Sequence, residues 1–203
     1  MAAPATTAAE VLDFWFGTAP DDAGVIADKG GLWFTRDDAV DAEIRARFGA
    51  LREAAIDGAL QAWSADPRAR LARIILVDQF SRNLFRGDAR AFEHDGLARA
   101  WTEEALRDGA DRRLRPVERV FLYLPLEHSE AAADQARSVA LFTALRDEAP
   151  PALHEAFASF LDYAVRHRDI VARFGRFPHR NAALGRVSSP EEVAFLAEPG
   201  SSF

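Results

Sequence analysis

The sequence predicts an all-α protein, an antiparallel array of about eight to ten helices. Three observations carry this prediction. Apolar residues recur at spacings of three and four over most of the chain. The alternating pattern of a half-buried strand does not extend over any useful length. Capping residues, Pro and Gly divide the periodic segments at short intervals, which favours short connections between neighbouring helices.

The first expected helix begins at the capping-box spacing Thr7-Ala8-Ala9-Glu10 and ends at Gly17. Residues 18–31 are rich in Asp, Gly and Pro, which predicts a loop. A helical pattern of apolar and charged residues then runs from Asp37 to about Asp57.

The central helix is expected from Pro67 to about Phe85, with Asp66 as its cap. Its run Ile74-Ile75-Leu76-Val77 is apolar on every side, which predicts a buried position. A parallel strand is the competing interpretation of that run, but the segment is too long and lacks flanking turn residues.

The second half of the chain shows boundary signals of the same kind, including Gly109, Pro116, Ser129 as a cap, and Pro150-Pro151. The helices expected there cover 95–107, 116–124, 129–148, 152–174 and 189–196. No linker rich in Pro, Gly or Ser divides the chain, so we expect one domain over 1–203, with residues 1–6 frayed.

Composition excludes several classes of function. The chain has 203 residues, 49% hydrophobic and 28% charged, which is typical of a soluble globular protein. A net charge of −7 argues against general nucleic-acid binding. The absence of cysteine excludes disulfides and thiolate metal sites and fits a cytoplasmic location. The sequence contains no secretory signal and no membrane-spanning run, and it indicates no cofactor.

The first polar motif is Asp78-Gln79-Phe80-Ser81-Arg82-Asn83-Leu84-Phe85-Arg86-Gly87. Asp78 and Arg82 are four residues apart, so they share a helix face and can pair. Gln79, Asn83 and Arg86 form an adjacent polar stripe. Because unpaired buried polar groups cost about 1–3 kcal/mol each, this stripe is either a structural network between helices or the lining of a ligand cavity.

The second motif is Glu127-His128-Ser129-Glu130. Glu and His can serve as acid/base groups or as metal ligands, although the spacing is not that of a zincin helix. Three interpretations stay open: acid/base chemistry, a metal site that also uses His179 or Asp78, and a structural role with Ser129 as a helix cap.

The third motif lies between Val165 and Arg186, where six arginines and two histidines accompany one acid. Gly175 and Pro178 predict a loop that presents the side chains of Arg176, His179, Arg180 and Asn181. A guanidinium fork suits a carboxylate or phosphate. The alternative is a basic loop that forms salt bridges with the acidic N-terminal third of the chain.

These motifs resemble a bacterial family of unknown function, DUF924. The resemblance rests on Val11-Leu12-Asp13-Phe14-Trp15-Phe16-Gly17, Trp33-Phe34, the motif from Asp78 to Gly87, Leu124-Pro125 with Leu126 to Glu130, and Phe174 to Asn181. It implies a fold similar to tetratricopeptide (TPR)-like α-α superhelices, although the chain shows no clear repeat of about 34 residues. It implies no activity, substrate or catalytic residue.

The preferred functional hypothesis is an internal, Arg-rich polar pocket for a small carboxylate or phosphate ligand. The candidate ligand-binding residues are Asp78, Gln79, Arg82, Asn83, Arg86, Arg176, Arg180 and Asn181. The candidate acid/base residues, should the protein be an enzyme, are Glu127, His128 and His179. The alternative is a TPR-like scaffold that binds a peptide or protein partner on its concave face. The sequence leaves the reaction and the oligomeric state open.

Overall fold

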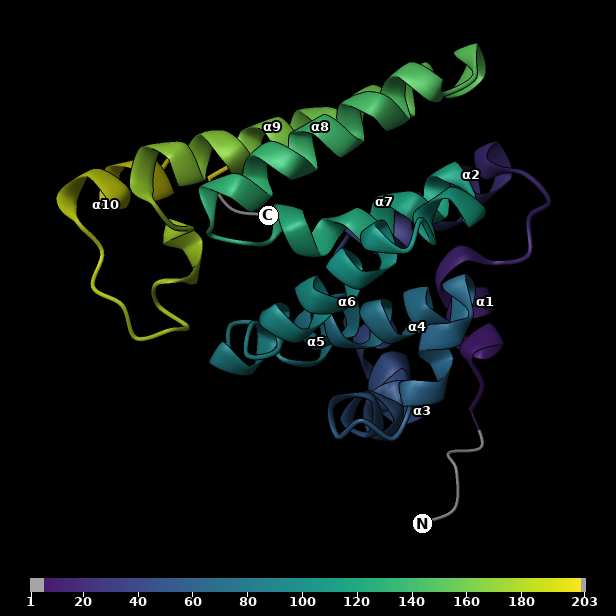
Figure 1. Ribbon diagram of the computed structural model, residues 1–203. Helices are drawn as coiled ribbons and strands as arrows, with labels where there is room; N and C mark the ends of the chain where they lie inside the picture. The colour runs from purple at the N-terminus through teal and green to yellow at the C-terminus, as the bar shows by residue number, and fades with distance from the viewer. Residues whose placement is uncertain (1–5, 202–203) are drawn as a thin grey trace.

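The computed structural model describes residues 6–201, and these form helices without any strand (Figure 1). The all-α prediction is therefore confirmed. The expected fraying of residues 1–6 lies, apart from Thr6, outside the described residues. The α-helices are α1 Ala8–Phe16, α2 Asp22–Phe34, α3 Asp38–Ile56, α4 Pro67–Val77, α5 Gln79–Leu84, α6 Asp95–Arg107, α7 Pro116–Glu127, α8 Ala132–Glu148, α9 His154–Phe174 and α10 Pro190–Leu196.

Helix α4 lies at the centre of the N-terminal body, where it packs against α1, α3, α6 and α7. Its residues Ile74 to Val77 are almost completely buried, which confirms the expectation from their all-round apolar pattern. The ring of Trp15 meets Phe80 and Phe121 edge-on, with centroids 5.5 Å apart in both pairs. This aromatic packing joins α1, α5 and α7 into one core.

Helices α8 and α9 form an antiparallel pair that lies along α7, and α10 lies beside the C-terminal end of α9 (Figure 1). A second, smaller apolar cluster of Ile170, Val171 and Phe177, with Phe174 and Phe195 against it, fastens the chain after α9 to that helix. Helix α9 ends at Gly175, whose φ of 70° is the left-handed conformation that glycine adopts without steric cost. The chain then enters the short 3-10 helix η5, Pro178–Arg180.

The predicted loop over residues 18–31 is wrong, because α2 occupies most of that segment. Asp21 caps α2 by accepting a hydrogen bond from the backbone N–H of Gly24 at 2.8 Å. Val25 and Trp33 are buried, and the Trp33 indole N–H donates to the Trp15 carbonyl at 2.8 Å. Tertiary packing against α1 and α7 therefore overrides the loop-like composition of this segment.

Two expected helix boundaries also differ. The single helix expected from Pro67 to Phe85 is interrupted at Asp78, whose carbonyl accepts a hydrogen bond from Arg82 Nη1 at 2.6 Å. Ser129 does not cap α8, which begins three residues later. Its hydroxyl donates to Asp134 and accepts from the Ala131 N–H. Within residues 6–201, no helix is long and apolar enough to cross a membrane.

Candidate functional site

Four segments that are distant in sequence bring charged side chains together beside α7. Arg180 in η5 donates from Nη1 to Asp95 Oδ2 at 3.3 Å. Asp95, the first residue of α6, also accepts a hydrogen bond from each terminal nitrogen of Arg82, at 3.0 and 3.2 Å. Arg82 Nη1 lies 3.3 Å from Asp78 Oδ1, which is 2.8 Å from His128 Nδ1. The result is one continuous network from Arg180 to His128.

Asp78 is the innermost member of this network and is completely buried. Burial alone would raise the pKa of its carboxyl, but the neighbouring Arg82 and His128 outweigh that effect and hold the pKa far below its usual range. Gln79 donates from Nε2 to the other carboxylate oxygen at 2.6 Å. Asp78 is therefore a fixed anion that orients Arg82 and His128.

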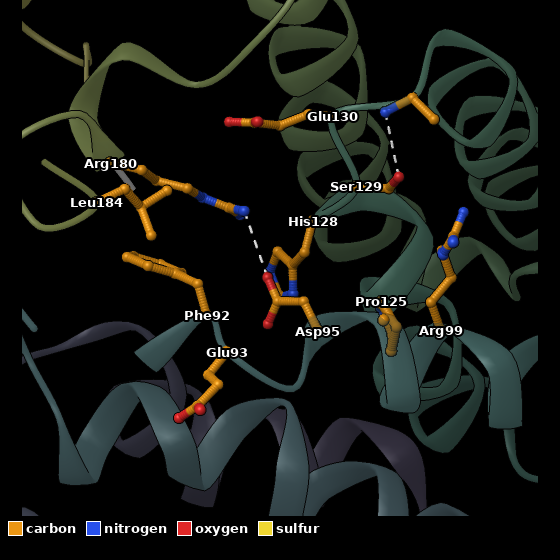
Figure 2. Close-up of a pocket in the computed structure, with 12 residues that line it drawn as sticks. Phe92, Glu93, Asp95, Arg99, Pro125, His128, Ser129, Glu130, Arg180 and Leu184 are labelled. Atoms are coloured by element: carbon orange, nitrogen blue, oxygen red, sulfur yellow. Dashed lines mark hydrogen bonds and ion pairs between the residues drawn. The ribbon is translucent and has the colours of Figure 1, made fainter. Parts of the chain in front are cut away.

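A cavity of about 400 Å³ opens on the outer side of this network. Its lining includes Phe92, Asp95, Arg99, His128, Glu130 and Arg180, which come from the start of α6, the turn between α7 and α8, and η5. Figure 2 shows the guanidinium of Arg180 and the imidazole of His128 pointing toward the same space, with the Asp95 carboxylate beside them.

Arg180 is the least satisfied cation of the site. Its guanidinium lies 4.7 Å from the centroid of the Phe92 ring and 4.5 Å from that of Phe177, and the residue is only 6% exposed. The one hydrogen bond that its side chain makes to a described residue is the long contact with Asp95, and its buried Nε atom has no partner within residues 6–201. Burial and then the nearby Arg82 lower its pKa to about 10, so it remains charged at neutral pH.

The acidic residues in the cavity wall are mostly neutralised by neighbouring arginines. Glu130 accepts two hydrogen bonds from Arg186, at 2.8 and 3.0 Å, and a third from the Phe177 backbone N–H. Asp95 is held by Arg82 on both oxygens. Glu93, whose side chain is 60% exposed, stays at the solvent side. The interior of the cavity therefore presents Arg180 rather than a free carboxylate.

His128 is the candidate acid/base residue that reaches this cavity. Because the anionic Asp78 accepts a hydrogen bond, we assign the imidazole proton to Nδ1, which leaves Nε2 with a lone pair. Burial and then the charge of Arg82 lower the pKa of His128, despite the opposing effect of Asp78. The imidazole is therefore neutral at pH 7.

Glu127, in contrast, lies behind the network and does not line the cavity. Its Oε1 is 3.1 Å from His167 Nδ1, and its buried Oε2 has no hydrogen-bond partner among the described residues. Burial and then the charge of Asp78 raise the pKa of Glu127 to about 8, while burial lowers the pKa of His167 to about 3. Both are neutral at pH 7, so the contact joins two uncharged groups.

His179 packs beside the site without lining the cavity. Its ring lies on Phe177, with centroids 5.6 Å apart. Burial, followed by the charge of Arg180, lowers its pKa to about 4. Of the three residues expected to perform acid/base chemistry, His128 alone faces the cavity.

Of the eight expected ligand-binding residues, Arg180 lines the cavity, whereas Asp78, Gln79 and Arg82 belong to the network behind it. The other four lie elsewhere. Asn83 and Arg86 bind Asp41 of α3, beside a separate cavity of about 330 Å³. Arg176 and Asn181 bind Glu192 of α10, which Arg176 holds with two hydrogen bonds of 2.7 and 2.8 Å. Each pairing uses an acid from a distant helix, which a reading of sequence spacing does not detect.

The alternative expectation for the basic loop is also corrected. Within residues 6–201, the salt bridges of this loop are made with acids outside the N-terminal third of the chain. Arg176, Arg180 and Arg186 bind Glu192, Asp95 and Glu130 respectively. The loop is therefore fastened to α6, α10 and the turn between α7 and α8.

Sequence reasoning missed two residues that shape the cavity, Asp95 and Phe92. Asp95 resembles an ordinary acidic residue in the first turn of a helix, and nothing in its spacing indicates two arginine partners. Phe92 lies in a short connection, where an aromatic residue carries no periodic signal. Within residues 6–201, no group of three or more His, Cys, Asp or Glu is arranged to hold a metal ion.

Comparison with known proteins identifies the family. The model of a family described as bacterial protein of unknown function (DUF924) matches residues 11–200. A solved structure of a protein of unknown function from Agrobacterium tumefaciens is 39% identical in sequence and aligns with a TM-score of 0.79. The alignment covers 94% of this chain and 96% of that one. No curated protein matches the chain. The chain therefore belongs to the DUF924 family of bacterial proteins of unknown function.

Proposed function

We propose that the cavity lined by Arg180 and His128 binds a small anionic molecule through a carboxylate or phosphate group. The observation that carries the proposal is the state of Arg180. It is a buried guanidinium with five N–H donors, and one long hydrogen bond to Asp95 is all that the described residues provide for them.

Such an arginine is costly to the fold without a partner. An unsatisfied buried donor costs about 1–3 kcal/mol, and more when it is charged. The rings of Phe92 and Phe177 both lie close to the guanidinium carbon, with centroids at 4.7 and 4.5 Å, and restrict its orientation. A planar, oriented guanidinium is suited to two parallel hydrogen bonds with a carboxylate or phosphate.

The size and charge of the cavity support the same ligand class. Its volume of about 400 Å³ falls within the range of about 300–1,000 Å³ that is typical of small-molecule sites. Arg186 and Arg82 neutralise Glu130 and Asp95, which reduces the repulsion that an entering anion meets.

A cavity of this kind favours a small ligand over an extended peptide. The TPR-like superhelix that the family resemblance implies remains a prediction, as do the peptide-binding concave face and a cytoplasmic location. A peptide groove needs a long open surface, whereas Arg180 and His128 line one cavity beside α7.

The proposal is tested by calorimetric titration with acetate, succinate and inorganic phosphate. We expect Arg180→Ala to weaken binding of the best of these anions at least tenfold, because the charged fork is lost. Arg176→Ala is the matched control: it also removes one arginine from the loop, but one that binds Glu192 away from the cavity. Arg180→Lys keeps the charge without the fork and is expected to be intermediate.

Two results would contradict the proposal. One is that none of the three anions binds the wild-type protein. The other is that Arg180→Ala and Arg176→Ala weaken binding equally. Thermal denaturation of each variant checks that it is folded, and an anion that binds the native state raises the Tm of the wild type with increasing concentration.

A further inference from the structure

His128 gives the cavity a second recognition group, which differs in kind from Arg180. It is the residue immediately after α7, where its backbone N–H donates to the Leu124 carbonyl at 2.9 Å and ends the helix. Its side chain is 13% exposed, and its Nδ1 is turned inward to the fully buried Asp78. Because His128 also lines the cavity, Nε2 is the ring nitrogen left to face a ligand.

Asp78 fixes what this nitrogen can do. A carboxylate that accepts from Nδ1 keeps the imidazole proton on that side, so Nε2 is an acceptor. No described residue donates to Nε2, since the contact with Asp78 is the one hydrogen bond of the His128 side chain within residues 6–201. The lowered pKa of His128 keeps the ring in this neutral, accepting form at pH 7.

The hydroxyl of the neighbouring Ser129 already has hydrogen-bond partners within the protein. It donates to Asp134 Oδ2 at 2.6 Å and accepts from the Ala131 N–H at 3.2 Å. It is therefore not the group that donates to His128. Arg99, on the same side of the cavity, is paired with Asp134 at 2.7 Å. Nε2 is therefore open to a hydrogen bond from a molecule in the cavity.

Arg180 and His128 thus need groups of opposite hydrogen-bonding character in one ligand. Arg180 offers N–H donors to an anionic group, and His128 offers a lone pair to a hydrogen-bond donor. In Figure 2 the two side chains point toward the same space. We propose that the ligand is a small hydroxy acid, a molecule whose carboxylate or phosphate binds Arg180 and whose hydroxyl donates to His128 Nε2. This inference rests on the proposed function and adds the second group of the ligand.

The test compares ligands that differ only at the hydroxyl. Calorimetric titration at pH 7.5 uses glycolate, acetate and methoxyacetate, with malate and succinate as a larger pair. We expect each hydroxy acid to bind about fivefold to tenfold more tightly than its deoxy partner, the effect of one added hydrogen bond of about 1 kcal/mol. Methoxyacetate keeps the oxygen but has no hydroxyl hydrogen, so it is expected to bind no better than acetate.

The variant His128→Asn isolates the contribution of Nε2. Asparagine keeps an N–H that can donate to Asp78, but it has no ring nitrogen facing the cavity. We expect acetate and succinate to bind this variant as they bind the wild type, while the advantage of glycolate and malate disappears. Because the comparison is between ligands on one folded protein, a general loss of stability cannot imitate this pattern.

The outcomes separate the two proposals. Equal binding of glycolate and acetate, or of malate and succinate, to the wild type would overturn the inference about the hydroxyl and leave the anion site intact. The same holds if His128→Asn keeps the full preference for the hydroxy acids. Failure of every anion to bind, or binding that does not change in Arg180→Ala, would overturn the proposed function and this inference with it.

Discussion

Glu127→Gln is predicted to remove a specific part of the dependence of stability on pH. Glu127 is 3% exposed, and burial followed by the charge of Asp78 raises its pKa to about 8, so the carboxyl group is neutral in the folded protein below that pH. In the unfolded chain the same group ionises near 4.5. Between these two values the unfolded state releases a proton that the folded state retains.

The sign and size of the change in the free energy of unfolding with pH follow from this difference in pKa. A pKa raised in the folded state gives stability that is complete below pH 4.5 and is lost as the pH rises toward 8. One proton corresponds to about 1.4 kcal/mol per pH unit. Between pH 6 and pH 8 the free energy of unfolding should therefore fall by about 2 kcal/mol through Glu127 alone. Glutamine is uncharged and similar in shape, so the variant lacks this loss.

The assay is urea denaturation of wild type and Glu127→Gln at pH 6 and pH 8. The lowered pKa values of His128, His167 and His179 add a slope of opposite sign below about pH 6.5, but that slope is common to both proteins. The quantity compared is therefore the difference in the free energy of unfolding between the two proteins. From pH 6 to pH 8 this difference should shift by about 2 kcal/mol in favour of the variant.

Glu130→Gln is the matched control. Arg186 and the Phe177 N–H overcome the effect of burial and lower the pKa of Glu130, so its carboxylate is charged in both states above pH 6. The free energy of unfolding of Glu130→Gln should therefore differ from that of the wild type by the same amount at pH 6 and pH 8. A difference in the free energy of unfolding that is also constant for Glu127→Gln would refute this prediction, because Glu127 would then be ionised in the folded protein.

Three further changes test the fold and the network. Gly175→Ala should cost about 1 kcal/mol in urea denaturation, because φ is 70° and no atom crowds an added Cβ; an unchanged midpoint would contradict the left-handed cap. Asp95→Ala should cost about 3 kcal/mol, since it leaves Arg82 and Arg180 without their shared carboxylate, and a loss below about 1 kcal/mol would show that the network contributes little. Phe121→Ala should cost about 3–5 kcal/mol, because the ring is fully buried against Trp15, and a smaller loss would mean that the core closes around the cavity left behind.

Local signals predicted much of the fold. The capping box of Thr7 and Glu10 is formed as expected, and the all-round apolar run in α4 is buried. These features depend on residues within one or two turns of each other. Helix α2 was missed because its stability comes from the packing of Val25 and Trp33 against other helices, while its composition is that of a loop.

The site was predictable only in part. The i,i+4 spacing of Asp78 and Arg82 correctly predicted their pairing, which the structure shows at 3.3 Å. Motif chemistry also selected His128 and Arg180, which line one cavity. It selected Arg176 as well, because a sequence shows that an arginine is present but not which acid it meets. The partner Glu192 lies 16 residues further along the chain, on another helix.

The most direct test of the central claim is a crystal structure of the protein soaked with selenate, a phosphate-like anion whose selenium gives an anomalous signal. We expect an anomalous peak within about 4 Å of the Arg180 guanidinium, in the cavity that His128 also lines. A peak in the other cavity, beside Arg36, Arg45 and Arg86, with none at Arg180, would contradict it.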